Sequence, residues 1–579
     1  MIQENIKKII ENSIKKIGKR DFLSNLKITI DIPKESTHGD FSVNVALVLA
    51  KMAKEDPMDI ANSLVEAARE IKGIEIERIE ALAPGFINFF LSEKFLEQEI
   101  NLILKKGSSY GSSQVGKGKT MVIDYSAPNI AKSFGIGHLR STIIGQAIYN
   151  IYSFLGWNCV GVNHLGDWGT QFGKLIYQIK NQVLMGSSDP DKSLNDLTIS
   201  ELESLYVGFH KEAEISPKLE DRAREEFKKL ESGDLEATKI WKACVDISIR
   251  EFNRIYDLLG VKIEHSIGES FYVEMTKEIV KELKDKNILK ESQGALVVEF
   301  PNEEFPSLVA IKSDRTSTYI VRDLATIRYR IDKWKPDLIA YEVGVDQSLH
   351  FKQLFKIVDM LGWEQKETFV HISHGLVRWP HGKFSTRRGD TVHLEDILEE
   401  SIERSLKIIE SVEDFSAEEK EEISRFVGVG AVKYNDLSQH HSKDILFDWE
   451  KILNLKGNSG PYLQYTFARC KGVLRKLEEE SLVKDISLVD INEDEKNILR
   501  LIRLFPMIVE EAGKEFSPNI ICNFLFDLSQ KYNLFYNRHP IIKAQGDEKK
   551  KLRIVITTAV AQVINNGLNL LGIEAPEKM

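Results

Sequence analysis

The order of hydrophobic and polar residues divides the chain into regions with different expected structures. Residues 6–17 have the spacing of an amphipathic helix, and residues 26–32 are typical of a strand. A further helix is predicted over residues 39–54, followed by a hairpin over residues 77–91. Residues 1–110 are therefore expected to form an N-terminal α+β domain.

The glycine- and serine-rich residues 107–118 indicate a linker, after which the pattern changes. Short apolar runs at residues 121–125 and 159–162 are typical of buried strands. Between them lies an apolar stripe with the i, i+4 spacing of a helix that faces a core: Leu139, Ile143, Ala147, Ile151 and Leu155. A strand, a glycine-containing loop, a helix and a strand favour a parallel, doubly wound sheet of the Rossmann type.

The rest of the chain separates into an insertion and a helical end. Residues from about 180–290 are mostly charged and helical, and they interrupt the alternation of strands and helices. Further strands are expected at residues 296–300, 338–343 and 369–372. We therefore predict an α/β catalytic domain at 119–393, which contains the inserted helical subdomain, and an all-α domain at 394–579.

Length and composition are typical of a multidomain cytoplasmic protein. The 579 residues are 42% hydrophobic and 29% charged, which is sufficient for several cores. The four cysteines lie dozens of residues apart, so neither a disulfide framework nor a zinc site is expected. No membrane association is expected, since no stretch reaches the ~18 apolar residues of a spanning helix. A net charge of −10 does not exclude nucleic acid, because phosphate contacts depend on local basic surface.

Residues 126–142, SAPNIAKSFGIGHLRST, follow the first strand of the doubly wound unit. Gly135 and Gly137 allow the backbone to approach a ligand, and the helix that begins here presents free N–H groups suited to a nucleotide phosphate. Lys132 and His138 can add donors where charge develops at the α-phosphate. An isolated G-x-G-H sequence is more often only a tight turn, so a second signal is needed.

That second signal is the segment 381–392, HGKFSTRRGDTV. Between its two glycines stand Lys383, Ser385, Thr386, Arg387 and Arg388, and such a loop can close on a leaving pyrophosphate. Alone, it is most simply interpreted as a solvated basic turn. Together, the two segments resemble the HIGH and KMSKS signatures of class I aminoacyl-tRNA synthetases.

Further motifs narrow the resemblance to one family. They are NHLGDWGTQFGK at 163–174, GESFY at 268–272, KSDRTSTYIVRD at 312–323 and GVDQSLHF at 344–351. With THGDFSVNVALVLAK, PGFINFF and the terminal GLNLLGIEAPEKM, they resemble arginyl-tRNA synthetases over nearly the whole chain. The resemblance implies an enzyme that uses ATP and Mg²⁺ to form arginyl-adenylate. It then transfers the arginine to the 3′-terminal adenosine of tRNA(Arg). The family also implies a monomer in which adenylate formation requires bound tRNA.

The resemblance also assigns residues to the site. The arginine pocket would comprise Ala127, Pro128, Asn129, His138, Tyr319, Asp323 and Gln347, with Glu269 as a second carboxylate. ATP would contact Gly135, Gly137, His138, Asp167, Gly169, Lys383 and Ser385, and catalysis would use Lys132, His138, Lys383 and Arg387. Paired carboxylates suit a planar guanidinium and disfavour the compact ammonium of lysine. Without the flanking match, Asp323 beside Arg322 would be a structural ion pair, and Trp168 is equally compatible with a core position.

The chain departs from the family pattern at several positions. Gly135 stands in place of the first histidine of HIGH, and Thr386 in place of the second lysine of KMSKS, with Phe384 for its methionine. Lys132 matches an upstream lysine that is thought to replace the missing one. Arg315 stands where glycine is usual in KSDG, so that turn must avoid or tolerate a positive φ. We interpret these departures as variation within an active enzyme.

The terminal domains offer candidate tRNA contacts. The N-terminal domain resembles a module that grips the tRNA elbow, in which Phe86 would stack on a base and Asn88 would bond its edge. The alternative places Phe86 in a core strand. The C-terminal helices resemble an anticodon-binding domain, with Tyr532, Phe535, Tyr536 and Asn537 as base contacts and Lys549, Lys550, Lys551 and Arg553 as phosphate contacts. Aromatic residues at such spacing are more often core.

Two rival functions remain open at this stage. One is a small-molecule ligase or nucleotidyltransferase on the same Rossmann core, which leaves the terminal domains without a purpose. The other is a synthetase-like RNA-binding protein without enzymatic activity, disabled by Gly135 and Thr386.

Overall fold

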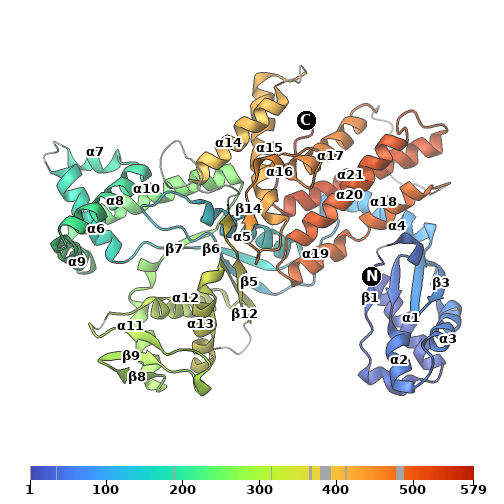
Figure 1. Ribbon diagram of the computed structural model, residues 1–579, viewed down its shortest axis with the longest axis horizontal. Helices are drawn as coiled ribbons and strands as arrows, with labels where there is room; N and C mark the ends of the chain where they lie inside the picture. The colour runs from blue at the N-terminus through green and yellow to red at the C-terminus, as the bar shows by residue number, and fades with distance from the viewer. Residues whose placement is uncertain are drawn as a thin grey trace.

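The computed structural model describes residues 2–33, 35–185, 187, 189–314, 316–363, 368–378, 393–410, 414–477, 488 and 490–579. The blue N-terminal module lies below the helical C-terminal domain in Figure 1, on the side of the molecule opposite the teal and green insertion. The central parallel sheet lies between them. Among the described helices, none has the length and apolar character needed to cross a membrane.

The N-terminal module is a four-stranded antiparallel sheet, in the order β1-β2-β4-β3, packed against helices. Its elements are α1 (Ile2–Lys16), η1 (Arg20–Asn25), β1 (Ile30–Asp31), η2 (Ser36–His38), β2 (Phe41–Val43), α2 (Val45–Ala53), α3 (Pro57–Ile71), β3 (Ile76–Leu82) and β4 (Phe86–Leu91). The start of α3 is fixed by Asp56, whose carboxylate accepts the N–H groups of Met58 and Asp59. The hairpin predicted at 77–91 is confirmed as β3 and β4.

Two expectations for this module were wrong in detail. The helix expected over 39–54 begins only at Val45, because β2 pairs with β4 and this tertiary pairing overrides the local helical pattern. The Asp40 N–H also bonds to the Phe89 carbonyl, which holds the chain extended at this point. The strand expected at 26–32 shortens to Ile30–Asp31, since only these residues find a partner in β2.

The helix α4 (Glu93–Lys106) leads from this module to the rest of the chain and is followed by η3 (Gly107–Ser109). Its buried residues Leu96, Ile100 and Ile103 belong to the large core shared by the catalytic and C-terminal domains. The N-terminal module has a separate core of its own, formed by α1 to α3 and the sheet. The module is therefore attached to the rest of the protein without sharing its core.

The central sheet is five-stranded and entirely parallel, in the order β12-β11-β5-β6-β7. Its elements and crossover helices include β5 (Thr120–Asp124), α5 (Ile136–Phe154), β6 (Asn158–Leu165), β7 (His265–Gly268), α12 (Tyr319–Trp334), β11 (Leu338–Gly344), η7 (Val345–Gln347), α13 (Ser348–Leu361) and β12 (Thr368–His374). Met121 and Ile123 face the core that contains α5, whereas Val122 faces α12 and α13. The predicted doubly wound sheet is confirmed, and its chain order reverses between β5 and β11, where such sheets bind ligands.

The insertion after β6 is helical, as expected, but it ends in a strand that the sequence pattern did not predict. Its helices are α6 (Thr170–Gln178), the π-helix η4 (Ile179–Leu184), α7 (Pro190–Asn195), α8 (Ile199–Ile215), α9 (Lys218–Glu231) and α10 (Leu235–Leu259). The strand β7, within the range taken as helical, then returns to the parallel sheet beside β6.

A small antiparallel sheet in the order β10-β9-β8 follows β7. This part comprises η5 (Glu269–Tyr272), α11 (Met275–Asp285), β8 (Leu289–Ser292), β9 (Ala295–Val298), η6 (Pro301–Glu303) and β10 (Leu308–Ile311). The strand expected at 296–300 is β9. It belongs to this small sheet and not to the parallel one, because its neighbours β8 and β10 are joined to it by short connections.

From residue 394 onward the chain is almost entirely helical, as predicted. The elements are α14 (Leu394–Ile409), α15 (Ala417–Leu437), β14 (Ile445–Leu446), α16 (Trp449–Ile452), α17 (Gly460–Leu474), α18 (Glu493–Ile502), α19 (Phe505–Lys514), α20 (Asn519–Arg538) and α21 (Asp547–Leu570). The short strand β14 pairs in parallel with β13 (Val377–Arg378), which continues the chain beyond the central sheet. The helical domain thus meets the catalytic domain directly.

Candidate active site

The loop 126–131 leaves β5 at the carboxyl edge of the sheet, at the point where the chain order reverses. Ser126, Ala127 and Ala131 have positive φ angles of 76°, 46° and 62°. Such angles cost a residue other than glycine about 1–3 kcal/mol and persist only where the surroundings enforce them. Backbone strain concentrated in one loop at a sheet edge is typical of a binding site.

Side chains from three elements hold this strained loop. The Ser126 N–H donates to Ser141 Oγ at 2.9 Å, and the Ala127 N–H donates to Asn163 Oδ1 at 3.0 Å. The Ala131 N–H donates to Ser248 Oγ at 2.9 Å. The Ser126 hydroxyl bonds to Tyr256 Oη at 2.8 Å, and that oxygen also accepts from Asn163 Nδ2 at 3.0 Å. Asn163 lies in a quoted motif, but no pattern indicated Ser248 or Tyr256, which approach from α10.

The turn before α5 opens onto free space. A side chain at Gly137 would meet nothing within 4 Å, and one at Gly135 would make only an ordinary contact with the His138 ring at 3.8 Å. Gly135 has a φ of −87°, so its backbone does not require glycine. The two glycines therefore leave room above the helix N-terminus, where backbone N–H groups attract an anion.

His138 lies at this turn with its ring orientation fixed. Its Nδ1 accepts the Gly135 N–H at 3.2 Å, and its ring packs edge-on against Phe134 with centroids 5.2 Å apart. Burial lowers the pKa of His138, and the nearby charge of Lys132 lowers it further. At neutral pH the ring is therefore uncharged, with its proton on Nε2, and that N–H is available as a donor.

Lys132 lies at the end of the strained loop, half-buried, with its ammonium 5.3 Å from the centre of the Tyr206 ring. Its positive charge also acts on His138 and lowers the pKa of that ring. The adjacent Ser133 donates to Glu203 at 2.6 Å, which ties the loop to α8 of the insertion. A cation and a neutral donor thus stand beside the same helix N-terminus.

The expected guanidinium-binding carboxylates lie at the ends of β7 and near the start of α12. Asp323 bonds to His350 Nε2 at 2.7 Å, and Glu269 forms an ion pair with Arg322 Nε at 3.0 Å. Burial raises the pKa of Glu269 to about 7; Arg322 opposes the shift, and the negative charge of Asp323 adds to it. The two carboxylates therefore lie close enough to repel each other.

The remaining expected arginine contacts border this pair. Tyr319 is the first residue of α12 and is 67% exposed, with the Arg322 guanidinium 4.7 Å from its ring centre. Gln347 immediately precedes α13, without a capping hydrogen bond from its side chain, and is exposed, as is Asn129 beside the end of β6. The half-buried His350, which lies in the quoted motif GVDQSLHF, is a neighbour of Asp323 that the resemblance did not assign.

Asp167 connects the ends of β6 and β7. Its carboxylate accepts both the backbone N–H and the hydroxyl of Ser270, at 2.8 and 2.6 Å. Burial raises its pKa, and these hydrogen bonds counteract the rise. A side chain at Gly268 would come within 2.1 Å of this carboxylate, so the close approach requires glycine. Gly169 has a φ of 137° and open space around it at the start of α6.

Trp168 packs edge-on against Trp241 and Phe227 in the insertion, with ring centroids 5.9 and 5.6 Å apart. Trp168 is half-buried and packs against the large core, which is compatible with the core alternative given above. Lys383, Ser385 and Arg387, together with Phe384, Thr386, Arg388 and Arg315, lie outside the described residues.

The residues expected to contact tRNA differ in how much of their side chains is exposed. Phe86 is half-buried, while Asn88 is 4% exposed and its carbonyl accepts the Ser42 hydroxyl at 2.7 Å. Tyr532 and Phe535 have no exposed surface, which corrects their expected role as stacking platforms: both rings belong to the helical core. Tyr536 is 38% exposed.

Among the other polar groups of this domain, Asn537 and Lys551 are exposed and Lys550 is half-buried. Arg553 and Lys549 both pair with the buried Glu495, so Arg553 is a structural cation and not a phosphate contact.

Comparisons with known proteins agree with this architecture. The catalytic domain of the class I tRNA synthetases (R) matches residues 99–449. The arginyl tRNA synthetase N-terminal domain matches residues 4–91, and the DALR anticodon binding domain matches residues 463–579.

Individual relatives match over the full length. The chain is 41% identical to the arginine–tRNA ligase of Clostridium botulinum (strain Alaska E43 / Type E3), covering 95% of this chain and 96% of the relative. It is 40% identical to that of Clostridium kluyveri, covering 100% and 99%. The crystal structure of the Plasmodium falciparum arginyl-tRNA synthetase superposes with a TM-score of 0.83 at 26% identity, covering 100% and 99%. The chain therefore belongs to the arginyl-tRNA synthetase family within the class I tRNA synthetases.

Proposed function

We propose that this protein is an ATP-dependent ligase that joins L-arginine to tRNA(Arg) in the cytoplasm, and that it acts as a monomer. In the first step, the arginine carboxylate attacks the α-phosphate of ATP to give arginyl-adenylate and pyrophosphate. In the second, a hydroxyl of the terminal ribose of the tRNA attacks the acyl group and AMP leaves. Catalysis is mainly positioning and charge stabilisation, since no covalent enzyme intermediate is needed.

The observation that carries the arginine assignment is the charge balance around Asp323. Arg322 offsets Glu269, whereas the closest partner of Asp323 is the imidazole of His350. With Glu269 ionised, the two carboxylates and Arg322 carry one net negative charge, which one guanidinium balances. A charge-assisted hydrogen bond from a guanidinium to Asp323 is worth about 1.5–3 kcal/mol.

The groups around the start of α5 suit the triphosphate. His138 offers an N–H donor, Lys132 a cation, and the helix N-terminus its free backbone N–H groups. We expect Gly135, Gly137 and Gly169 to give ATP close access to the backbone, with Asp167 shaping the site through Ser270. Mg²⁺ is expected to arrive with ATP, as part of the substrate complex.

The matched terminal domains are the proposed tRNA-binding surfaces. Phe86 in the N-terminal module and the exposed Tyr536 and Asn537 in the helical domain remain the proposed base contacts. Tyr536 stands beside Arg469, whose guanidinium lies 4.9 Å from its ring centre. A cation next to an exposed ring suits a stacked base and its phosphate.

The test is arginine-dependent exchange of pyrophosphate into ATP, measured with and without tRNA. We expect exchange that appears only when tRNA(Arg) is added, and no exchange with lysine in place of arginine. Exchange that never needs tRNA would favour the small-molecule ligase. No exchange under any condition would favour the RNA-binding protein, and filter binding of labelled tRNA would then detect the remaining activity.

A further inference from the structure

The strained loop 126–131 is held from two helices that belong to different parts of the catalytic domain. Ser141 lies on α5, while Ser248 and Tyr256 lie on α10. The backbone strain is opposed by these hydrogen bonds, and the two contributions are similar in size. The loop therefore keeps its conformation only while both helices stay in place.

The helix α15, which belongs to the helical part of the chain after residue 394, holds the first of these two helices. Asp436 on α15 accepts Arg140 Nε with both carboxylate oxygens, at 3.1 and 3.0 Å. The other nitrogens of Arg140 donate to the carbonyls of Lys443 and His441, at 2.9 and 3.2 Å. Both charged side chains are 1% exposed. Arg140 is the immediate neighbour of Ser141, so this contact fixes the part of α5 that bonds to the loop.

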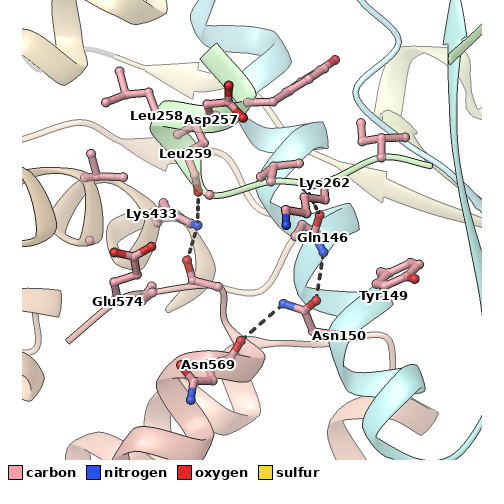
Figure 2. Close-up of a pocket in the computed structure, with 18 of the residues that line it drawn as sticks. Gln146, Tyr149, Asn150, Asp257, Leu258, Leu259, Lys262, Lys433, Asn569 and Glu574 are labelled. Atoms are coloured by element: carbon pink, nitrogen blue, oxygen red, sulfur yellow. Dashed lines mark hydrogen bonds between the residues drawn. The ribbon is translucent and has the colours of Figure 1, made fainter. Parts of the chain in front are cut away.

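The helix α15 also holds α10, the second of these two helices. One turn before Asp436, the buried Lys433 donates to the carbonyl of Leu259, the last residue of α10, at 2.7 Å, and also to the carbonyl of Gly572. Figure 2 shows its ammonium between these two carbonyls, with Glu574 nearby. Leu259 lies three residues beyond Tyr256, so Lys433 acts on the end of α10 that reaches the loop.

A cavity of about 1050 Å³ opens beside this contact, lined by α5, α15, the end of α10 and the segment after α21. The apolar packing of these elements, to which Leu259, Val429 and Ile573 contribute, is interrupted here. Beside the cavity, polar groups bridge the elements: Lys433 with its two carbonyls, and Asn150 Nδ2, which donates to the Asn569 carbonyl at 3.3 Å (Figure 2). Removing one of these groups leaves space into which α10 can move.

We propose that Lys433 and Asp436 are positioning residues for the active site: from one face of α15 they fix α10 and α5 relative to each other and thereby keep the 126–131 loop in its strained conformation. A shift at α15 is thus transmitted to the backbone of Ala127 and to Lys132 without any contact between α15 and a substrate. This inference rests on the proposed function only where activity is the readout.

Hydrogen–deuterium exchange of peptides covering residues 125–132 tests the proposal without any activity. The amides of Ser126, Ala127 and Ala131 are bonded to side chains, so loss of the loop conformation exposes them. We expect Asp436→Asn and Lys433→Met each to accelerate exchange in these peptides about 10-fold, the factor that corresponds to about 1.4 kcal/mol. The control is Asp40→Asn, which alters a buried acidic group of the N-terminal module that pairs with Arg503 of the helical domain.

The proposal would be overturned if residues 125–132 kept their protection from exchange in both α15 variants. This comparison is made between variants whose thermal stability falls as much as that of Asp40→Asn. Equal acceleration in Asp40→Asn would overturn it as well. If Asp436→Asn does not fold, Lys433→Met and Asp436→Glu take its place. We expect Asp436→Glu, which keeps the charge, to retain most of the protection that Asp436→Asn loses.

Pyrophosphate exchange per titrated active site gives the second readout. We expect kcat to fall about 10- to 100-fold in Asp436→Asn, because misplacement of reacting groups by about 1 Å has effects of this size. The arginine KM should rise with it, while the tRNA KM changes little; a wild-type kcat would overturn the proposal. If the wild-type enzyme shows no pyrophosphate exchange, only the proposed function is rejected. The deuterium uptake of residues 125–132 then still tests whether Lys433 and Asp436 position the loop.

Discussion

Two buried aspartate–arginine contacts connect the helical C-terminal domain to the rest of the chain, and they use the same chemistry for different purposes. Asp40 of the N-terminal module pairs with Arg500 and Arg503, each at 3.2 Å. Asp436 of the helical domain pairs with Arg140 of α5 at 3.0 Å. All of these side chains are largely or fully buried.

The difference lies in what each contact joins. Asp40 also accepts the Leu91 N–H at 2.9 Å, and Arg503 stacks on Phe41, so this junction ends in the sheet of a module with a separate core. The partners of Asp436 lie within one shared core and adjoin the strained loop. The Asp40 ion pairs thus attach the N-terminal module to the helical domain, whereas the Asp436 ion pair positions a helix of the active site.

Removal of one arginine at each junction is expected to affect the two junctions differently. Arg140→Met is expected to lower the free energy of unfolding by about 3–5 kcal/mol, because it leaves the Asp436 carboxylate buried without a countercharge. Arg503→Met should cost less, since Arg500 still pairs with Asp40. Urea denaturation of both variants measures the difference, and a larger loss for Arg503→Met would reverse the comparison.

On the active-site side, Lys132→Ala should slow adenylate formation by ~10²-fold or more if the ammonium stabilises the charge on the α-phosphate. Rapid-quench measurement of a single turnover isolates this step. Lys106→Ala provides a control on the helix that leads out of the N-terminal module, where loss of a cation should leave the step unchanged. A near wild-type rate for Lys132→Ala would remove this lysine from the chemistry.

Asp323→Asn is expected to weaken the binding of arginine. We expect the arginine KM to rise about 10- to 100-fold, as expected for a lost charge-assisted hydrogen bond of about 1.5–3 kcal/mol. The ATP KM should stay nearly constant, because the contact proposed for Asp323 is with the guanidinium and not with ATP. Asp40→Asn should leave the arginine KM unaltered and affect only the KM for tRNA. An unaltered arginine KM in Asp323→Asn would exclude this carboxylate from the pocket.

The smallest expected effect is a pH dependence of arginine binding. Burial raises the pKa of Glu269 to about 7, so this carboxyl is ionised above that pH and protonated below it. The arginine KM should therefore rise as the pH falls from 8 to 6, by no more than roughly 10-fold. Glu269→Gln should flatten the profile, whereas Asp40→Asn should keep it. A flat wild-type profile would show that Glu269 does not interact with the guanidinium.

Local patterns predicted the elements whose formation depends on nearby residues. The β3–β4 hairpin, β5, α5 and β6 all lie close to their expected positions, because their apolar periodicity directly reflects the face they bury. The four residues of β7 carry no such pattern, and only pairing with β6 makes them a strand. Residues 41–43 likewise form a strand because β4 lies beside them.

The sequence predicted those residues of the candidate site that lie in recognisable motifs. Gly135, His138 and Asp323 were predicted from sequence motifs, and they lie near the starts of α5 and α12. Ser248 and Tyr256 were not found, because their role exists only once α10 folds against the loop. Tyr532 and Phe535 show the opposite error: an aromatic side chain suits a base and a core equally, and only burial separates the two.

The separation of Arg140 from Asp436 along the chain has a consequence for synthesis on the ribosome. The two residues are 296 positions apart, so α5 emerges long before its acidic partner. The N-terminal module, whose core is local, can fold at once, whereas contacts between distant segments form slowly. Until α15 follows, Arg140 stays hydrated and the 126–131 loop lacks its final support. The nascent chain therefore completes its active site only after most of its residues have been made.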